Sequence, residues 1–192
     1  LGNSDGRFVR QRQLPRMALI ATELDADGQL VLRAPEMPEQ VVGQASGPRM
    51  EVAVWGDTVQ ARRGDPEVDV WCSDFLRRPC RLVRMPPDTV RQVSPDYAEP
   101  DDQVGFADGF PFLLISQASL DDLSQRAGQA LSMRRFRPNL VVSGCEPYAE
   151  DGWQRLRIGE ITFRVAKPCS RCIVPTIDPD NAERGAEPLR TL

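Results

Sequence analysis

Two cysteines three residues apart, Cys169 and Cys172, are the residues whose types and spacing are best suited to chemistry. Their segment also contains Lys167, the single lysine among 24 basic residues. A Cys-x-x-Cys pair can be a thiol–disulfide redox centre, half of a structural zinc site, or the source of a thiolate for a metal centre carried by an organic cofactor. On local sequence alone a fourth interpretation is favoured, in which both are small buried hydrophobic residues on a strand.

The residues around the pair separate these uses. A thioredoxin-type redox pair needs its first cysteine at a helix N-terminus, but residues 173–177 are β-branched and interrupted by proline, so we expect no helix there. Structural zinc needs four ligands; the three other cysteines are far apart in sequence, although folding could still assemble them. The third use, a cysteine thiolate that binds a metal carried by an organic cofactor, stays open. The positive charges of the neighbouring Arg171 and Lys167 would favour the thiolate form.

The complete absence of histidine narrows the chemistry further. It excludes Ser-His-Asp and Cys-His catalysis and every metal site that contains histidine. Thiol, carboxylate, arginine and cofactor chemistry are left. Five cysteines at irregular spacings, in a sequence without an export signal, make a disulfide framework improbable.

Charge and hydropathy exclude two classes of partner. Residues of both signs give a net charge of −4, so the protein has no overall positive field to attract nucleic acid. The local cluster of Arg134, Arg135 and Arg137 is nevertheless suited to a phosphate. No apolar run approaches the roughly 20 residues that a membrane span requires, so we expect no membrane partner. The first residues lack the features of a secretory signal, and we expect a cytoplasmic location.

In the first half of the chain, turn residues at 25–28 and 56–57 each separate two strand-like runs, which predicts two β-hairpins. Asp65 and Pro66 then open a predicted helix. The apolar face of this helix consists of Val68, Trp71, Cys72 and Phe75. A strand at 81–85 and a polar, proline-rich loop at 86–102 follow.

In the second half we expect a buried strand at 112–115, a helix that begins at Ser119, and a strand at 139–145. A hairpin around Gly159 delivers the chain to Cys169. The sequence therefore predicts a fold that is mainly β with a few helices (α+β). We divide it into a β-rich N-terminal domain at 1–90 and a β-barrel domain at 91–192.

Several motifs, in order along nearly the whole chain, resemble the MOSC domain and the β-rich domain that precedes it. The branch is the one that contains the mitochondrial amidoxime reducing component and its YcbX-type bacterial relatives. In the second half the motifs are RPNLVVSG at 137–144, YAEDGW at 148–153, IGE at 158–160, CSRC at 169–172 and TIDP at 176–179. In the first half they are DG at 5–6 and RQLPR at 12–16.

The resemblance implies a pyranopterin molybdenum cofactor, molybdopterin, held between the two domains with a cysteine sulfur on molybdenum. By the family pattern Cys172 is the ligand and the catalytic residue, with Cys169 as the alternative. Arg137 and Asn139 match positions near the cofactor, as a guanidinium fork suits a phosphate and an amide suits a pterin edge. The turn of Asp108, Gly109 and Phe110 matches a loop that lines the cofactor.

The function implied by the resemblance is an oxidoreductase that reduces N-hydroxylated small molecules with electrons from a separate iron-sulfur or flavin protein. The alternative is a non-catalytic carrier of sulfur or of molybdenum cofactor that uses a cysteine persulfide. The family also brings an association with pyridoxal phosphate binding. An N-terminal Lys-Ser-Cys segment and the C-terminal strands of the barrel have no counterpart in the sequence, so we expect a chain truncated at both ends.

Overall fold

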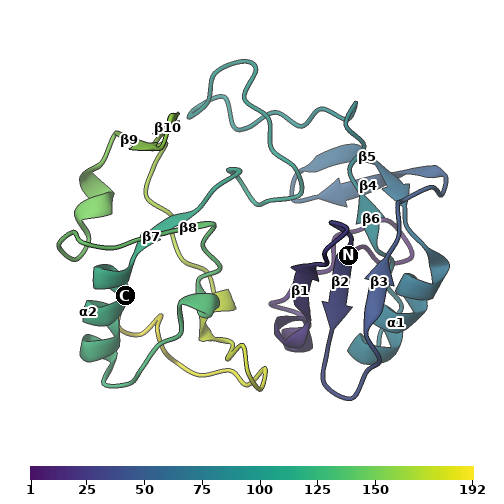
Figure 1. Ribbon diagram of the computed structural model, residues 1–192, viewed down its shortest axis with the longest axis horizontal. Helices are drawn as coiled ribbons and strands as arrows, with labels where there is room; N and C mark the ends of the chain where they lie inside the picture. The colour runs from purple at the N-terminus through teal and green to yellow at the C-terminus, as the bar shows by residue number, and fades with distance from the viewer. The chain divides into compact units, whose positions relative to one another are not determined.

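The computed structural model describes residues 1–192, which form two compact units. The first comprises Leu1–Arg91, Val104–Asp108 and Pro179–Glu183, and the second comprises Gln92–Gln103, Gly109–Asp178 and Arg184–Leu192. Each unit combines short strands with one α-helix (Figure 1). The predicted fold class, mainly β with a few helices, is confirmed. The domain division at residue 90 stays a prediction.

The first sheet of the first unit is antiparallel, with its three strands in chain order. They are β1 (Ala21–Leu24), β2 (Leu30–Arg33) and β3 (Gln40–Val42), which lie side by side in Figure 1. The turn between β1 and β2 contains Gly28, whose φ of 75° lies in the left-handed region that glycine adopts without steric cost. This is the first predicted hairpin, and the structure confirms it.

The second sheet of this unit contains β4 (Arg49–Val54), β5 (Asp57–Arg63) and β6 (Val83–Arg84). Strands β4 and β5 form the second predicted hairpin. Alternate side chains of the pair are buried, as the two-residue period of a strand requires. These are Val52, Val54, Val59 and Ala61. Strand β6 is shorter than the predicted strand at 81–85.

Helix α1 (Pro66–Leu76) covers the core of the first unit. The side chain of Asp65 caps it by accepting the backbone N–H of Glu67 at 2.9 Å. All four residues of its predicted apolar face are buried, Cys72 among them, in one cluster with Val9 and Leu32. The Trp71 indole N–H donates to the carbonyl oxygen of Pro38 at 2.7 Å, so its polar edge is also satisfied.

The second unit is built on two parallel strands, β7 (Leu114–Ser116) and β8 (Leu140–Val142), connected through α2 (Gln117–Ala127). A parallel pair needs such a crossover because its ends lie far apart. The core beneath the helix consists of Ile115, Leu120, Leu123, Leu131 and Phe136.

Two details of this region differ from the prediction. Helix α2 begins at Gln117 because the hydroxyl of Ser116, not of Ser119, is the N-cap and accepts the N–H of Ser119 at 3.0 Å. The buried strand begins only at Leu114, and Phe112 is 56% exposed. A short apolar run does not reveal from sequence alone which of its residues face the core.

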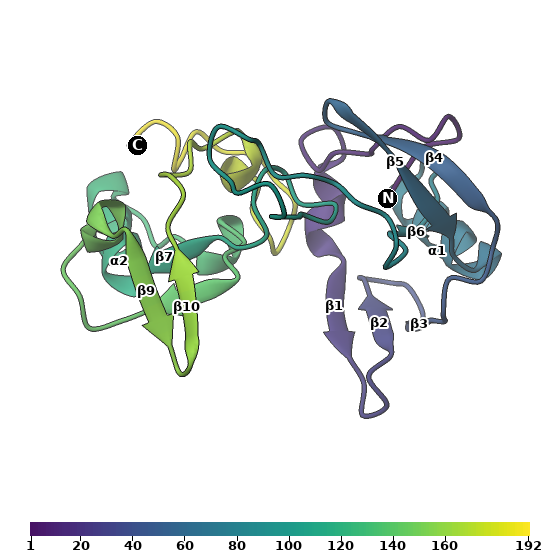
Figure 2. The same ribbon diagram turned by 90° about the horizontal axis from the view of Figure 1, so that it is seen from above.

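The hairpin of β9 (Arg155–Ile158) and β10 (Ile161–Arg164) turns at Gly159, as predicted, and Figure 2 shows its two antiparallel strands. Four short 3-10 helices complete the chain. They are η1 (Pro15–Leu19), η2 (Met133–Arg135), η3 (Ala149–Gly152) and η4 (Val174–Thr176). None of the helices combines the length and apolar character needed to cross a membrane.

Candidate functional site

The segment that follows β10 carries both cysteines of the Cys-x-x-Cys pair with their side chains exposed. The Cys169 thiol points toward the carbonyl oxygen of Ser170 at 3.7 Å. The Cys172 sulfur accepts the backbone N–H of Val174 at 3.5 Å. The interpretation of the pair as buried hydrophobic residues is therefore wrong, and both sulfur atoms are open to a ligand or reagent.

A short 3-10 helix, η4, begins two residues after Cys172, although we expected no helix there. Pro175 does not prevent it, because a proline within the first turn needs no N–H donor and has a suitable φ. The Thr176 hydroxyl donates to the carbonyl oxygen of Ile173 at 2.8 Å and closes the turn. The N–H of Val174 that meets the Cys172 sulfur thus belongs to the first residue of a closed turn.

The segment after Cys172 is fixed against the segment that precedes Arg137. The Arg135 guanidinium forms an ion pair with Asp178 and also donates to the carbonyl oxygen of Pro175 at 3.4 Å. The Arg171 guanidinium lies 5.4 Å from the centre of the Phe136 ring. Two parts of the chain that lie 35 to 43 positions apart in sequence therefore meet within one unit.

Arg137 and Asn139 are both exposed and lie between η2 and β8. Arg137 has a φ of 55°, an uncommon conformation for a residue other than glycine, asparagine or aspartate. The side-chain oxygen of Asn139 accepts the N–H of Leu113 at 2.9 Å, while the Asn139 N–H donates to the Leu113 carbonyl at 2.8 Å. The oxygen of this amide is therefore used to align β7 with β8, and its NH₂ group is the end suited to a ligand.

The predicted turn of Asp108, Gly109 and Phe110 is divided between the units, since Asp108 belongs to the first and the other two to the second. In the first unit the Arg91 guanidinium, 7% exposed, binds the carbonyl oxygens of this loop and pairs with Asp57 at 2.7 Å. The carbonyls are those of Gly105, Ala107 and Asp108, at 2.8, 2.6 and 3.2 Å.

This arrangement determines the direction of the loop's amides. In a planar trans peptide the C=O and the N–H point in opposite directions. Because the carbonyls of Ala107 and Asp108 point at Arg91, the N–H groups of Asp108 and Gly109 point away from it. A turn that presents N–H groups in this way suits an anion such as a phosphate.

Phe110, in the second unit, lies close to Lys167 and to Tyr97, and the sequence did not indicate Tyr97 as functional. Its ring lies 6.2 Å from that of Tyr97 in an edge-on arrangement. The ammonium group of Lys167 lies 4.4 Å from the Tyr97 ring centre and 5.7 Å from that of Phe110. The proximity of Lys167 to the cysteines was visible in the sequence, but nothing there connected it with Tyr97.

A second missed feature is the hydrogen-bonded cluster around Glu150. One carboxylate oxygen of Glu150 accepts the N–H of Ser116 at 2.9 Å and the hydroxyl of Ser119 at 2.7 Å. Burial raises the pKa of Glu150, but these hydrogen bonds outweigh burial and lower the pKa overall. The Ser119 hydroxyl also accepts the N–H of Tyr148 at 2.7 Å, so the cluster ties the YAED motif to the start of α2.

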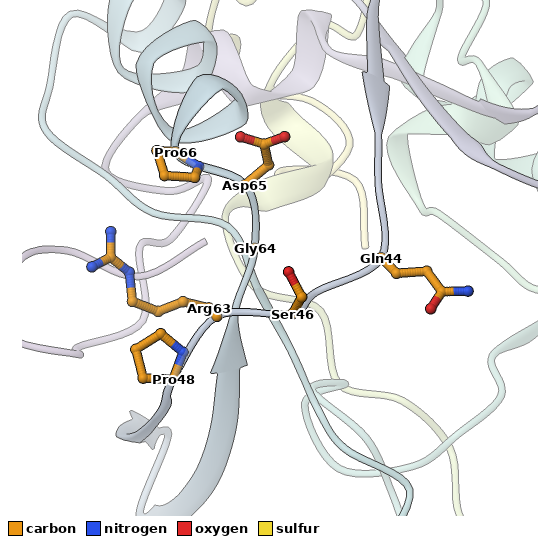
Figure 3. A pocket seen from close by; sticks show the side chains of 8 residues that line it. Gln44, Ser46, Pro48, Arg63, Gly64, Asp65 and Pro66 are labelled. Carbon is orange, nitrogen blue, oxygen red and sulfur yellow. The ribbon is translucent and has the colours of Figure 1, made fainter.

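A cleft of about 340 Å³ lies elsewhere, in the first unit. Figure 3 shows that its lining comes from residues 44–48 and from residues 63–66 at the start of α1. None of the predicted site residues contributes to it, so we do not place the site there.

The donor groups of the second unit fit a molybdenum cofactor. They are the exposed thiol of Cys172, the guanidinium of Arg137, the side-chain amide of Asn139 and the ring of Phe110, which lies near Lys167. No group of three or more cysteine, aspartate or glutamate side chains is placed to hold a metal ion. A metal at Cys172 would therefore have to bring further ligands with it, as a metal carried by an organic cofactor does.

Two family models match the chain and confirm the resemblance. The MOSC N-terminal beta barrel domain matches residues 1–79, and the MOSC domain matches residues 101–192. A solution structure of a Bordetella bronchiseptica protein is 27% identical, and the match covers 45% of this chain and 70% of that protein at a TM-score of 0.40.

Relatives of known name match along almost the whole chain. Mitochondrial amidoxime-reducing component 1 is 36% identical over 199 residues in Mus musculus and over 200 residues in Homo sapiens. Component 2 of Bos taurus is 34% identical over 196 residues. The matches cover 98–99% of this chain and 58% of each relative, so the chain spans less than two thirds of their length.

These names correct one expectation. The relatives are called mitochondrial, which contradicts the cytoplasmic location inferred from the sequence. The cytoplasmic location was inferred from the first residues of the sequence. Targeting segments are distinct from the folded domains, so the composition of the domains does not reveal the location. The comparisons give no support to pyridoxal phosphate binding.

Proposed function

The chain belongs to the MOSC domain family and joins a MOSC N-terminal beta barrel domain to a MOSC domain. We propose that the whole protein is a molybdenum-cofactor oxidoreductase that reduces N-hydroxylated compounds. The relatives named amidoxime-reducing components support this substrate class. We further propose that the electrons come from a separate iron-sulfur or flavin protein, as the family resemblance implies.

One observation carries the proposal. The exposed Cys172 lies on a segment that is tied to the segment before Arg137 and Asn139 by the Arg135–Asp178 pair and by Arg171 on Phe136. A thiolate ligand, a phosphate-binding arginine and an amide therefore belong to one unit. These are the groups that a cofactor with a metal, a phosphate and a polar ring edge requires.

The residues have separate roles in this proposal. Cys172 provides the sulfur ligand, and the N–H of Val174, 3.5 Å from that sulfur, stabilises negative charge on it. Arg137 binds the phosphate, while the NH₂ group of Asn139 contacts the ring edge. The amides of the Asp108 turn add donors to an anion. Cys169 is the alternative ligand.

When bound, the cofactor supplies the two-electron chemistry that removes oxygen from an N-hydroxylated compound. The chain supplies orientation and charge. Proton delivery would come from solvent or a carboxylate, because the sequence has no histidine to supply it. The exposed cysteine segment keeps the site open to a small molecule.

The exposure of both cysteines also favours a second candidate, a carrier that holds sulfur as a persulfide on Cys172 and catalyses no reduction. A carrier needs a sulfur that a partner can reach, and the exposed Cys172 meets this requirement. Both candidate functions therefore depend on Cys172.

Molybdenum content of the purified full-length protein tests the proposal. We expect bound molybdopterin in the wild type, loss of molybdenum in Cys172→Ser, and retention in Cys145→Ser, a control outside the pair. Retention in Cys169→Ser would assign the ligand to Cys172. Metal-free wild-type protein that releases labile sulfur from Cys172 on treatment with cyanide would overturn the enzyme and support the carrier.

A further inference from the structure

The side chain of Lys167 connects three segments of the second unit. Lys167 lies two residues before Cys169, and its ammonium group faces the rings of Tyr97 and Phe110 at 4.4 and 5.7 Å. Tyr97 belongs to the loop of residues 92–103, and Phe110 belongs to the turn proposed to line the cofactor. An ammonium group over aromatic faces is attracted by their negative charge density.

Arg164, three residues before Lys167, holds the same loop. It donates to the Tyr97 carbonyl oxygen at 2.8 Å and to the Asp102 carboxylate at 3.0 Å. The loop is itself closed by the Val93 N–H, which donates to the Asp102 carbonyl at 3.0 Å. The end of the hairpin therefore holds the loop at two places, near its middle and near its base.

Between the end of β10 and Cys169, the chain is attached to the hairpin by a single backbone hydrogen bond. Strand β10 ends at Arg164, and residues 165–172 have no regular secondary structure. The N–H of Val165 donates to the Gln154 carbonyl at 2.9 Å, and this is the last backbone bond from the hairpin before the cysteines. After Val165, the next contact along the chain is that of Lys167 with the two rings. Only Pro168 separates Lys167 from Cys169, and the fixed φ of proline limits how the cysteine can move relative to the lysine.

We infer that Lys167 is a positioning residue, which holds the Cys169–Cys172 segment at a set distance from the Phe110 turn by binding the rings of Tyr97 and Phe110. This inference rests on the proposed function, because it assigns Lys167 a role toward the same cofactor. The lysine aligns the start of the cysteine segment, and the Arg135–Asp178 pair aligns its end.

Hydrogen–deuterium exchange of the chain without cofactor tests the contact itself. In Lys167→Met, which keeps side-chain length but loses the charge, we expect exchange of the hydrogen-bonded amides of Val93, Tyr97 and Val165 to rise about two- to fivefold. Lys167→Arg keeps a cation over the rings and should restore slow exchange. Arg157→Met removes an exposed basic residue from the same hairpin and should behave as wild type.

Exchange in Lys167→Met equal to that of the wild type would overturn the inference, as would failure of Lys167→Arg to restore it. An unchanged thermal midpoint in all three variants shows that the effect is local.

Molybdenum content then separates this inference from the proposed function. We expect Lys167→Met to lower molybdenum content at least about twofold in the full-length protein and Lys167→Arg to recover it. Full content in Lys167→Met together with loss in Cys172→Ser would overturn the positioning role and leave the proposed function intact. Full content in Cys172→Ser would instead contradict Cys172 as the ligand, whatever the exchange data show.

Discussion

The guanidinium of Arg135 pairs with the carboxylate of Asp178, across 43 positions of the sequence. The Arg135 side chain is 13% exposed and that of Asp178 is 30% exposed, so the pair is largely removed from water. It joins η2, which leads to Arg137, with the residues that follow η4, and thereby fixes the far end of the cysteine segment. Arg135 is consequently engaged within the fold, and the proposed contact of Arg137 with a phosphate rests on the family resemblance.

Separating the Arg135–Asp178 pair is expected to destabilise the chain. Arg135→Gln removes the Arg135 cation from a half-buried carboxylate and should lower the free energy of unfolding by about 1–3 kcal/mol. Urea denaturation of Arg135→Gln, Asp178→Asn and the double variant measures the coupling, expected at about 0.5 kcal/mol or more. Strictly additive effects of the two substitutions would show that the pair does not stabilise the fold.

The five thiols are expected to fall into distinct classes of reactivity with a maleimide reagent. Cys169 and Cys172 are exposed and should react first, whereas Cys145 is only partly exposed. Cys72 and Cys80 are buried, and burial raises the pKa of both thiols, so they should react only after denaturation. Peptide mass spectrometry after timed labelling identifies each class. Early labelling of Cys72 would contradict the packing of α1.

Alkaline pH is expected to weaken the first unit through Cys72. Burial raises the pKa of its thiol from 9.0 to about 12. Above pH 9.0 the unfolded chain releases this proton while the folded chain retains it, so the stabilisation is present below pH 9.0 and is lost as pH rises toward 12. The slope should be at most about 1.4 kcal/mol per pH unit.

The control for this prediction is Cys72→Ala, which is less stable at neutral pH because it leaves a cavity. All other titrating groups are shared with the wild type, so the difference between the two proteins isolates the thiol. Urea midpoints measured across the alkaline range should converge. Parallel curves would show that Cys72 does not ionise differently in the two states.

Acid pH is expected to act through Glu150. Its pKa is lowered in the folded chain, because the hydrogen bonds from Ser116 and Ser119 outweigh the opposing effect of burial. Its contribution is therefore present above the ordinary value of 4.5 and is lost as pH falls through the lower folded-state pKa. Glu150→Gln keeps one acceptor oxygen but loses the charge.

At neutral pH we expect Glu150→Gln to be about 1–3 kcal/mol less stable than the wild type. Below the pKa of Glu150 the two proteins should approach each other in urea midpoint. Asp151→Asn, a substitution at the next residue, serves as the control for a general charge effect. A constant difference between wild type and Glu150→Gln at every pH would contradict the network.

The features that could be predicted from sequence depend on neighbouring residues. The hairpins at Gly28 and Gly159 follow from turns that need a left-handed residue, and helix α1 follows from the Asp65 cap and the spacing of its apolar residues. The Cys-x-x-Cys spacing and the absence of histidine likewise narrowed the chemistry before any fold was known. Errors such as the start of α2 arose where two serines three residues apart were equally good caps.

The sequence by itself therefore determined the family, the strand-rich fold class and the residue types available to the site. Only the tertiary structure decided that both cysteines are exposed, that Arg135 is paired with Asp178, and that Lys167 meets Tyr97. These contacts join residues 40 to 70 positions apart. Local propensities contain no information on such pairs, because they form only when packing brings distant segments together and when burial makes an unpaired charge costly.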